Sequence, residues 1–237
     1  MDAYMYLFAL LAKHATLKEL EWRMLMFPAL VEGVTKTTPR PFRQLRNLDC
    51  HATDTAIIAL LPRLPDLEVL DLLLDTEFPG ARYPINLSIL PSAAQCTNLR
   101  VFKLYASSET QVYIPPQEFL DFTGACNQLE QLGISAETSY HLNLRIPGFT
   151  DSHFEVLVSQ LPGLRKLNLE HGLDELLSAQ SLLSLGAHCP CLEELNLGGV
   201  FDLSLLRSTD RVLFPNLRKT ILRKFESISG SSADNVQ

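Results

Sequence analysis

The chain has 237 residues, of which 46% are hydrophobic and 20% charged, an ordinary soluble composition with enough apolar side chains for a sizeable core. Its 27 acidic and 20 basic residues give a net charge of −7. This charge argues against nucleic acid or an anionic membrane as the main partner, because both attract clustered Lys and Arg. Leucine stands out, since it occupies 46 of the 237 positions.

The cysteine count and the apolar runs indicate where the protein works. The chain contains five cysteines, an odd number that argues against a disulfide scaffold. The longest apolar run, residues 3–12, has about half the length of a membrane-spanning helix and no basic residue before it. Neither a membrane anchor nor a signal peptide is therefore expected, and we predict a cytoplasmic or nuclear protein.

The first predicted element is a helix over residues 3–15 that is apolar on nearly all sides. A terminal helix of a stacked fold normally has a polar outer face, because it has a neighbour on one side only. An apolar end surface of this kind indicates an absent neighbour, a dimer contact or a bound partner.

Two later segments, residues 53–72 and 150–169, are copies of one pattern and are identical at eight of 20 positions. Each begins with Thr-Asp, continues with apolar residues at helical spacing and ends in Leu-Pro-x-Leu-x-x-Leu-x-Leu. Asp54 and Asp151 are expected to cap the two helices. The final Leu-x-Leu pair has the period of two of a short strand with one buried face. Each unit is therefore predicted to be a helix followed by a strand.

The strand half of this pattern occurs eight times, at intervals of 22 to 35 residues. Its first leucine is found at Leu17, Leu45, Leu67, Leu99, Leu129, Leu164, Leu192 and Leu217. Three positions before each of these leucines stands a residue that we call the slot residue. The slot residues are His14, Phe42, Leu64, Cys96, Cys126, Leu161, Cys189 and Phe214. Seven of these eight are apolar or cysteine, which predicts a buried column.

The slot cysteine and the leucines after it form the pattern Cys-x-x-Leu-x-x-Leu-x-Leu, seen most clearly from Cys189 to Leu197. Over residues 14–225 the chain resembles the cysteine-containing leucine-rich repeats of F-box substrate receptors. The resemblance implies an α/β fold, a curved right-handed leucine-rich-repeat solenoid with a parallel sheet on its inner face. We expect one domain of about eight irregular repeats over residues 1–225. A disordered polar tail is expected over residues 226–237.

The resemblance also implies a function, the recognition of protein substrates for a cullin–RING ubiquitin ligase. No F-box-like module precedes the first repeat, so we expect the chain to be the repeat portion of a longer receptor. Ligase subunits would then dock through a missing or separate module. A stand-alone scaffold or inhibitor is the alternative, and an enzyme on a solenoid frame is a further one.

Side chains alternate across a strand, so the residues between and just after the buried leucines are expected to point away from the core. In the first three strands the middle positions are Glu21, Asp49 and Asp71, which we call the acidic row. Adjacent like charges destabilise a sheet, so this row predicts a protein partner with a basic segment. The alternative is a solvated face of an acidic protein. The predicted inner-face site consists of Glu21, Asp49, His51, Val69, Asp71, Leu73, Val101, Lys103, Tyr105, Lys166, Asn168, Glu170 and Asn196.

Two further surfaces are candidates for binding. The insertions at residues 75–92 and 136–149 are longer than their repeats require, and loops often carry function. A small apolar and aromatic anchor pocket is also expected between the acidic row and a more basic far end. It consists of Val69, Leu73, Val101 and Tyr105.

Catalytic motifs are not found in the sequence: it has no Gly-x-Ser-x-Gly elbow, no P-loop and no Gly-x-Gly-x-x-Gly after a strand. Cys189 and Cys191 lack the second ligand pair that a structural zinc site needs. Cys50 and His51 are neighbours on one strand, so their side chains are expected to diverge. We therefore expect no enzymatic activity, no metal site and no cofactor.

Overall fold

The computed structural model describes residues 3–75, 84–86, 89–107, 111–136, 144–169, 177–198, 201 and 212–223. Within these residues it contains two parallel sheets, seven α-helices and one short 3-10 helix. In chain order the elements are α1 (Ala3–Ala12), β1 (Glu19–Met26), α2 (Pro28–Thr37), β2 (Asn47–Ala52), α3 (Asp54–Leu60), η1 (Leu61–Arg63), β3 (Val69–Leu74), β4 (Pro84–Asn86), α4 (Ile89–Ala93), β5 (Val101–Ala106), β6 (Gln111–Tyr113), α5 (Pro116–Ala125), β7 (Gln131–Ala136), β8 (Leu144–Arg145), α6 (Asp151–Ser159), β9 (Lys166–Leu169), α7 (Ala179–His188), β10 (Glu194–Gly198) and β11 (Lys219–Arg223).

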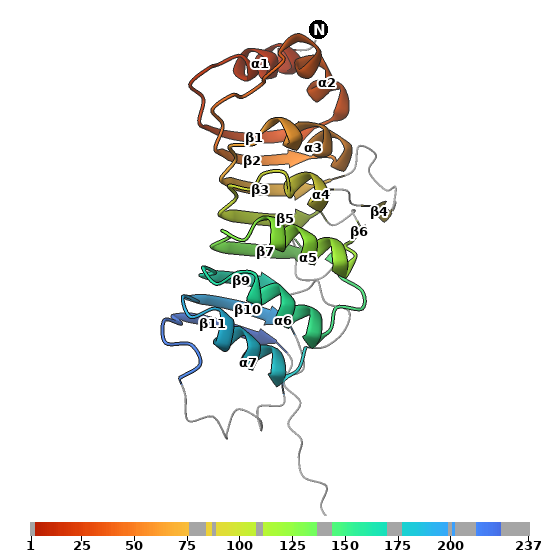
Figure 1. The fold of residues 1–237 in the computed structure, drawn as a ribbon. Coiled ribbons are helices and arrows are strands. Elements are labelled where there is room, and N and C mark those ends of the chain that lie inside the picture. The colour runs from red at the N-terminus through yellow and green to blue at the C-terminus, as the bar shows by residue number, and fades with distance from the viewer. Residues whose placement is uncertain are drawn as a thin grey trace, which may run out of the picture.

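The larger sheet has eight strands in the order β1-β2-β3-β5-β7-β9-β10-β11, and its neighbouring strands are parallel. Its strand order follows the chain, and the helices α3 to α7 stack in one layer along it (Figure 1). We call the side under the helices, which carries Leu70 and Leu72, the covered face. The opposite side, which carries Asp49 and Asp71, is the open face. The expectation of an α/β fold with a parallel sheet is confirmed.

All eight segments predicted to be strands from the repeated leucine pattern form the strands of this sheet. In β2, β3 and β5 buried and part-buried residues alternate strictly, as expected for strands whose one face only is covered by helices. The predicted inward residues Leu48, Leu70 and Phe102 are fully buried. β11 differs because it lies at the edge of the sheet, where Thr220 is exposed and Leu222 is part-buried.

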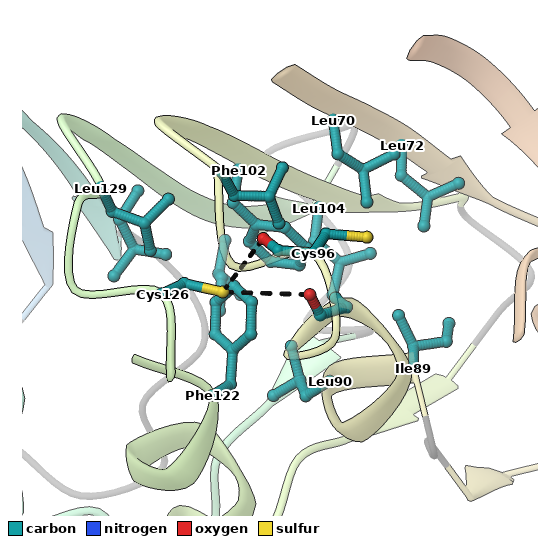
Figure 2. Close-up of a cluster of buried hydrophobic side chains, with 14 of the residues drawn as sticks. Leu70, Leu72, Ile89, Leu90, Cys96, Phe102, Leu104, Phe122, Cys126 and Leu129 are labelled. Carbon is teal, nitrogen blue, oxygen red and sulfur yellow. Dashed lines mark hydrogen bonds between the residues drawn. The ribbon is translucent and has the colours of Figure 1, made fainter. Parts of the chain in front are cut away.

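The slot cysteines have a packing role that accounts for their recurrence. Cys126 donates its S–H to the backbone carbonyl of Cys96 at 3.7 Å (Figure 2). Cys96 does the same to Leu64 at 3.4 Å, and Cys189 to Leu161 at 3.4 Å. In each pair the acceptor is the slot residue of an earlier repeat. Each of these carbonyls also accepts a backbone N–H, so the thiol adds a second, weak donor, and it suits the position because it is small and apolar.

The helix starts correct one expectation from the sequence. The N-cap of α3 is Thr53, whose hydroxyl accepts a backbone N–H at 3.3 Å, and not Asp54. The N-cap of α6 is Thr150, whose own N–H donates to His153 Nδ1 at 3.2 Å, and not Asp151. Each aspartate is instead the first residue of its helix, where the helix dipole favours a carboxylate. The prediction was wrong by one residue because Thr and Asp are both good caps.

The smaller sheet, in the order β4-β6-β8, was not predicted. β4 lies in the insertion at residues 75–92 and β8 in the insertion at residues 136–149, so the two insertions are linked through β6. Ile114 and Ile146 beside this sheet are fully buried. Parts of both insertions, and the tail predicted over residues 226–237, lie outside the described residues.

The chain begins with an apolar end surface, as expected from the sequence. α1 ends at Ala12 and not at residue 15, and Phe8 is its largest fully buried side chain. The exposed large side chains of α1 are Tyr4, Tyr6, Leu7 and Leu10.

In the described part of the chain, no helix has both the length and the apolar character that spanning a membrane requires.

Candidate functional site

The register of the larger sheet arranges the open face in columns. The acidic row is confirmed as a geometric feature, since Glu21 lies beside Asp49, and Asp49 beside Asp71, in the register of the adjacent strands. Glu170, the predicted inner-face residue that directly follows β9, lies outside the described residues. The middle column continues beyond the acidic row through Lys103, Gly133, Asn168, Asn196 and Ile221.

Two cations lie inside the acidic row and compensate most of its charge. Arg23 Nε is 2.6 Å from Glu21 Oε1, and its Nη2 is 3.1 Å from Asp49 Oδ2. Lys103 Nζ is 2.7 Å from Asp71 Oδ2. The three carboxylates therefore share two cations, and one negative charge is left uncompensated. Sequence reasoning did not include Arg23 in the site, although it stands two positions after Glu21 and so projects from the same side of β1.

The pKa values reflect this mutual pairing. Burial raises the pKa of Asp49, Arg23 lowers it, and the nearby Asp71 and Glu21 raise it again, with a net increase. Burial lowers the pKa of Lys103, but its hydrogen bond and charge interaction with Asp71 outweigh this and raise it. A basic side chain from a partner would therefore compete with Arg23 and Lys103 for the same carboxylates.

The predicted anchor pocket is only partly formed. Leu73 and Tyr105 are neighbours in register and line a hollow of about 230 Å³. Val69 and Val101 are also neighbours in register, but they lie four residues earlier on the same strands and do not line this hollow. The remaining lining residues are Arg23, Asp49, Cys50, His51 and Asp71.

His51 is held at the side of this hollow by a small polar network. Its Nε2 lies 3.0 Å from Asp75 Oδ2, and Ser107 donates to Asp75 Oδ1 at 2.8 Å. The network ties β2 to the residues that follow β3 and β5. His51, one of the predicted inner-face residues, therefore contributes a positioned imidazole to the open face.

A second hollow, of about 180 Å³, lies in the far half of the open face and is lined by residues of β5, β7, β9, β10 and β11. Sequence reasoning included Lys103, Tyr105, Lys166, Asn168 and Asn196 from its lining. It missed Gln131, Gly133, Glu194, Lys219 and Ile221, which line the hollow as well. The signal that marks the place is a glycine in the middle column, where the neighbouring strands carry long side chains.

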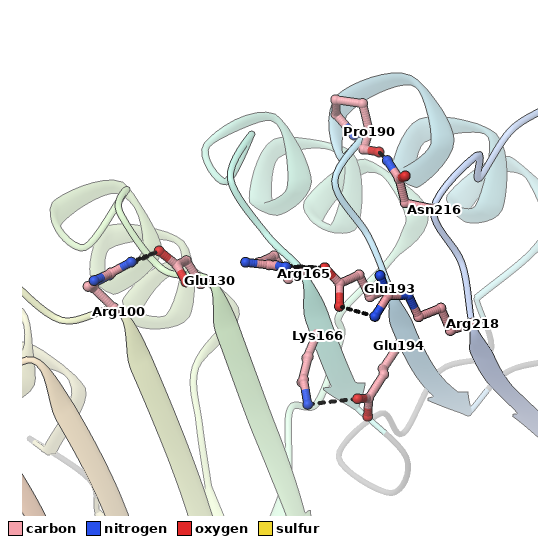
Figure 3. A network of polar contacts seen from close by, with 9 residues as sticks. All are labelled: Arg100, Glu130, Arg165, Lys166, Pro190, Glu193, Glu194, Asn216 and Arg218. Carbon is pink, nitrogen blue, oxygen red and sulfur yellow. Dashed lines mark hydrogen bonds and ion pairs between the residues drawn. The ribbon is translucent and has the colours of Figure 1, made fainter.

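A column of alternating charge runs along the start of the strands, and we call it the charge ladder (Figure 3). Arg46 Nη1 lies 2.6 Å from Glu68 Oε1, and the pair Arg100–Glu130 repeats this arrangement. Each acid of the ladder pairs with an arginine of the ladder, but five bases stand against three acids, so the column keeps a net charge of +2. The members, each directly after the first leucine of a repeat, are Lys18, Arg46, Glu68, Arg100, Glu130, Arg165, Glu193 and Arg218.

The cysteines that are buried do not have the character of nucleophiles. Burial raises the pKa of Cys50 strongly, and it raises that of Cys96 to about 11. Burial raises the pKa of Cys126 and of Cys189 to about 12. These groups stay protonated at neutral pH, and the thiolate is the reactive form. Among the described residues, no three His, Cys, Asp or Glu side chains are grouped closely enough to hold a metal ion.

Comparison with known proteins gives no relative from which a function can be transferred. No protein-family model and no curated protein matches the sequence. The candidate site is therefore described by its own geometry, an open sheet face with one hollow walled by carboxylates and another walled by lysines and amides.

Proposed function

We propose that this chain is a leucine-rich-repeat solenoid that binds a protein partner on its open face. Three features of the described residues support the repeat assignment: the eight strands of the larger sheet, seven of them preceded by an α-helix, the slot column, and the helices along one side of the sheet. The observation that carries the binding assignment is the make-up of the open face. Its middle column changes from acidic through basic to amide side chains, whereas the covered face, which packs against helices, repeats leucine from strand to strand.

A protein partner fits this face better than a small molecule does. The two hollows of about 230 and 180 Å³ share Tyr105 and lie along one sheet from β1 to β11. Eight strands at a spacing of about 4.8 Å extend over roughly 30 Å, so a ligand that engages both hollows must be long. Within this proposal, a basic residue of the partner lies against the one uncompensated charge of the acidic row.

The finer role that we propose is substrate recognition for a cullin–RING ubiquitin ligase. It is supported by the resemblance of the slot-cysteine repeats to those of F-box substrate receptors. The docking function would then come from a module outside this sequence. A stand-alone scaffold or inhibitor would use the same open face without bringing ligase subunits to the partner.

The test is affinity purification of the tagged chain from cells of its native source, read by mass spectrometry. The variant Asp49→Lys, Asp71→Lys changes the open face, and Asp66→Lys, Asp121→Lys makes the same change of net charge at exposed sites elsewhere. We expect a partner that the wild-type chain and the control retain and the open-face variant loses. A partner retained equally by all three would exclude the open face as the binding surface.

The same experiment separates the two roles. Recovery of cullin–RING subunits together with the partner is the result expected of a substrate receptor. One stoichiometric partner without ligase subunits favours the scaffold or inhibitor role.

A further inference from the structure

Gly133 lines the hollow in the far half of the open face, between Lys103 on β5 and Asn168 on β9. A Cβ at this position would lie 3.5 Å from Lys103 Cγ and 4.0 Å from Asn168 Cβ, which are ordinary contact distances. The residue lies in regular strand pairing and has no left-handed backbone angle. Neither crowding nor backbone conformation therefore requires glycine here, and what its missing side chain provides is room above the sheet.

One wall of the hollow contains a polar atom that lacks a partner. Asn168 Oδ1 is buried, and no donor within the described residues hydrogen-bonds to it. A buried carbonyl oxygen without a donor is unfavourable, and most such atoms in folded proteins are paired. A ligand in the hollow that presents an N–H group would satisfy this oxygen.

The charges around the hollow favour an acidic ligand. Lys166 forms an ion pair with Glu194 (Figure 3), with 2.7 Å between Nζ and Oε1, and the Nζ of Lys103 is paired with Asp71. Lys219 is beside Glu194 in register and is exposed, and the described residues include no ion-pair partner for it. Asp71 compensates Lys103 and Glu194 compensates Lys166, so Lys219 is the cation of this lining that stays available to an acidic ligand.

We propose that this hollow binds an extended acidic segment of the protein partner. An amide N–H of the segment donates to Asn168 Oδ1 above Gly133, and an adjoining Asp or Glu carboxylate pairs with Lys219. This inference rests on the proposed function, because it names the chemistry of the partner at one end of the open face. The segment runs across the strands β7 to β11, at the end of the open face away from the acidic row.

The probe is a library of random linear peptides displayed on phage, selected on the full chain. Enriched peptides should be rich in Asp and Glu, and synthetic copies should bind the chain in fluorescence anisotropy. Gly133→Leu fills the hollow and Lys219→Glu reverses its charge, so each should weaken binding by about tenfold or more. Gly163→Leu makes the matched change at an exposed glycine outside the open face, where an added Cβ meets nothing within 4 Å, and should leave binding unchanged.

Asn168→Leu distinguishes a ligand contact from a structural role. It removes the unpaired oxygen, so the chain should unfold at a higher urea concentration than the wild type. The same variant should bind the selected peptides about tenfold more weakly or worse, because the N–H of the peptide loses its acceptor. A residue that only supported the fold would not combine greater stability with weaker binding.

Three results would overturn the inference. The first is a selection that enriches no acidic peptides, and the second is a set of enriched peptides that bind Gly133→Leu and Asn168→Leu as tightly as the wild type. The third is a purified partner that Gly133→Leu retains while Asp49→Lys, Asp71→Lys loses it. This last result would leave the proposed function standing and reject only the hollow. Circular dichroism of each variant checks that it is folded.

Discussion

The two faces of the eight-stranded sheet differ in how far each strand repeats the one before it. On the covered face, from β1 to β10, one column contains almost only leucine, and its members are fully or almost fully buried. They are Leu20, Leu48, Leu70, Phe102, Leu132, Leu167 and Leu195. On the open face the column one residue further along changes from acid to base to glycine to amide within the same strands.

This difference separates the residues that make the fold from those that are free to serve a partner. A leucine under the helices has neighbours on all sides, so only a side chain of similar volume replaces it at low cost. A residue on the open face has neighbours only within its sheet. Packing therefore restricts its identity less, so residues that contact a protein partner can be accommodated on this face without loss of the fold.

The largest expected effect comes from truncating a buried side chain of β5 to alanine, and the comparison is the same truncation on the open face of that strand. Phe102 is fully buried, with its ring centroid 4.6 Å from that of Phe122, so Phe102→Ala should lower the free energy of unfolding by about 3–5 kcal/mol. Tyr105→Ala, on the open face of the same strand, should cost less than about 1.5 kcal/mol. Urea unfolding followed by circular dichroism measures both. Equal costs would contradict the division between the faces.

The covered face could be predicted from the sequence because it depends on local spacing. Helical spacing before Pro65 and Pro162 and the Leu-x-Leu pairs after them each span only a few residues, and the eight copies support one another. The slot cysteines were predicted to be buried for the same reason. What local spacing could not decide was a choice between adjacent caps, such as Thr53 and Asp54.

The open face could be predicted only as a set of residues. Its geometry depends on register between strands that are 22 or more residues apart. The position of Lys103 beside Asp71 and the gap at Gly133 follow from that register. The smaller sheet depends on the pairing of three short segments, which have no leucine pattern to mark them. The acidic row was therefore predicted correctly as a row, but without the cations that compensate it.

Asp151, in the helix layer beside the covered face, should give the next largest effect. Burial would raise its pKa, but hydrogen bonds from the hydroxyls of Ser178 and Ser181 and from the Ser178 N–H lower it below its ordinary value. Because the folded pKa is the lower one, the stabilisation is present at neutral pH and is lost as pH falls through the folded pKa. Asp151→Asn should cost about 1–2 kcal/mol at neutral pH.

Urea unfolding of the wild type and of Asp151→Asn over a range of pH measures this effect. The difference between them should shrink as the carboxyl group of the wild type becomes protonated. A difference that stays constant down to the lowest pH would show that Asp151 acts through packing and not through its charge.

Asp49, on the open face, should show the opposite pH dependence and a smaller effect. Its pKa is raised, chiefly by burial, so the ionised carboxylate is less favourable in the folded chain than in the unfolded one. This penalty is complete above the folded pKa and disappears as pH falls below the unfolded pKa. Asp49→Asn should therefore be as stable as the wild type or slightly more stable at neutral pH, and lose that advantage in acid. A clear loss of stability at neutral pH would show that the pairing with Arg23 outweighs burial.

The smallest effect is expected at the charge ladder, which belongs to neither face. Glu193 Oε1 accepts from Arg165 Nε at 2.8 Å and its Oε2 lies 3.8 Å from Arg218 Nη1, whereas Glu130 pairs with Arg100. Glu193→Gln leaves two arginines without a carboxylate and Glu130→Gln leaves one, so the first should lower the midpoint of thermal unfolding slightly more. Both shifts should fade as salt is added, because exposed charges are screened. A shift that persists at high salt would mean that the ladder acts through the geometry of its hydrogen bonds and not through its charges. The ladder would then help to specify the fold, as the covered face does.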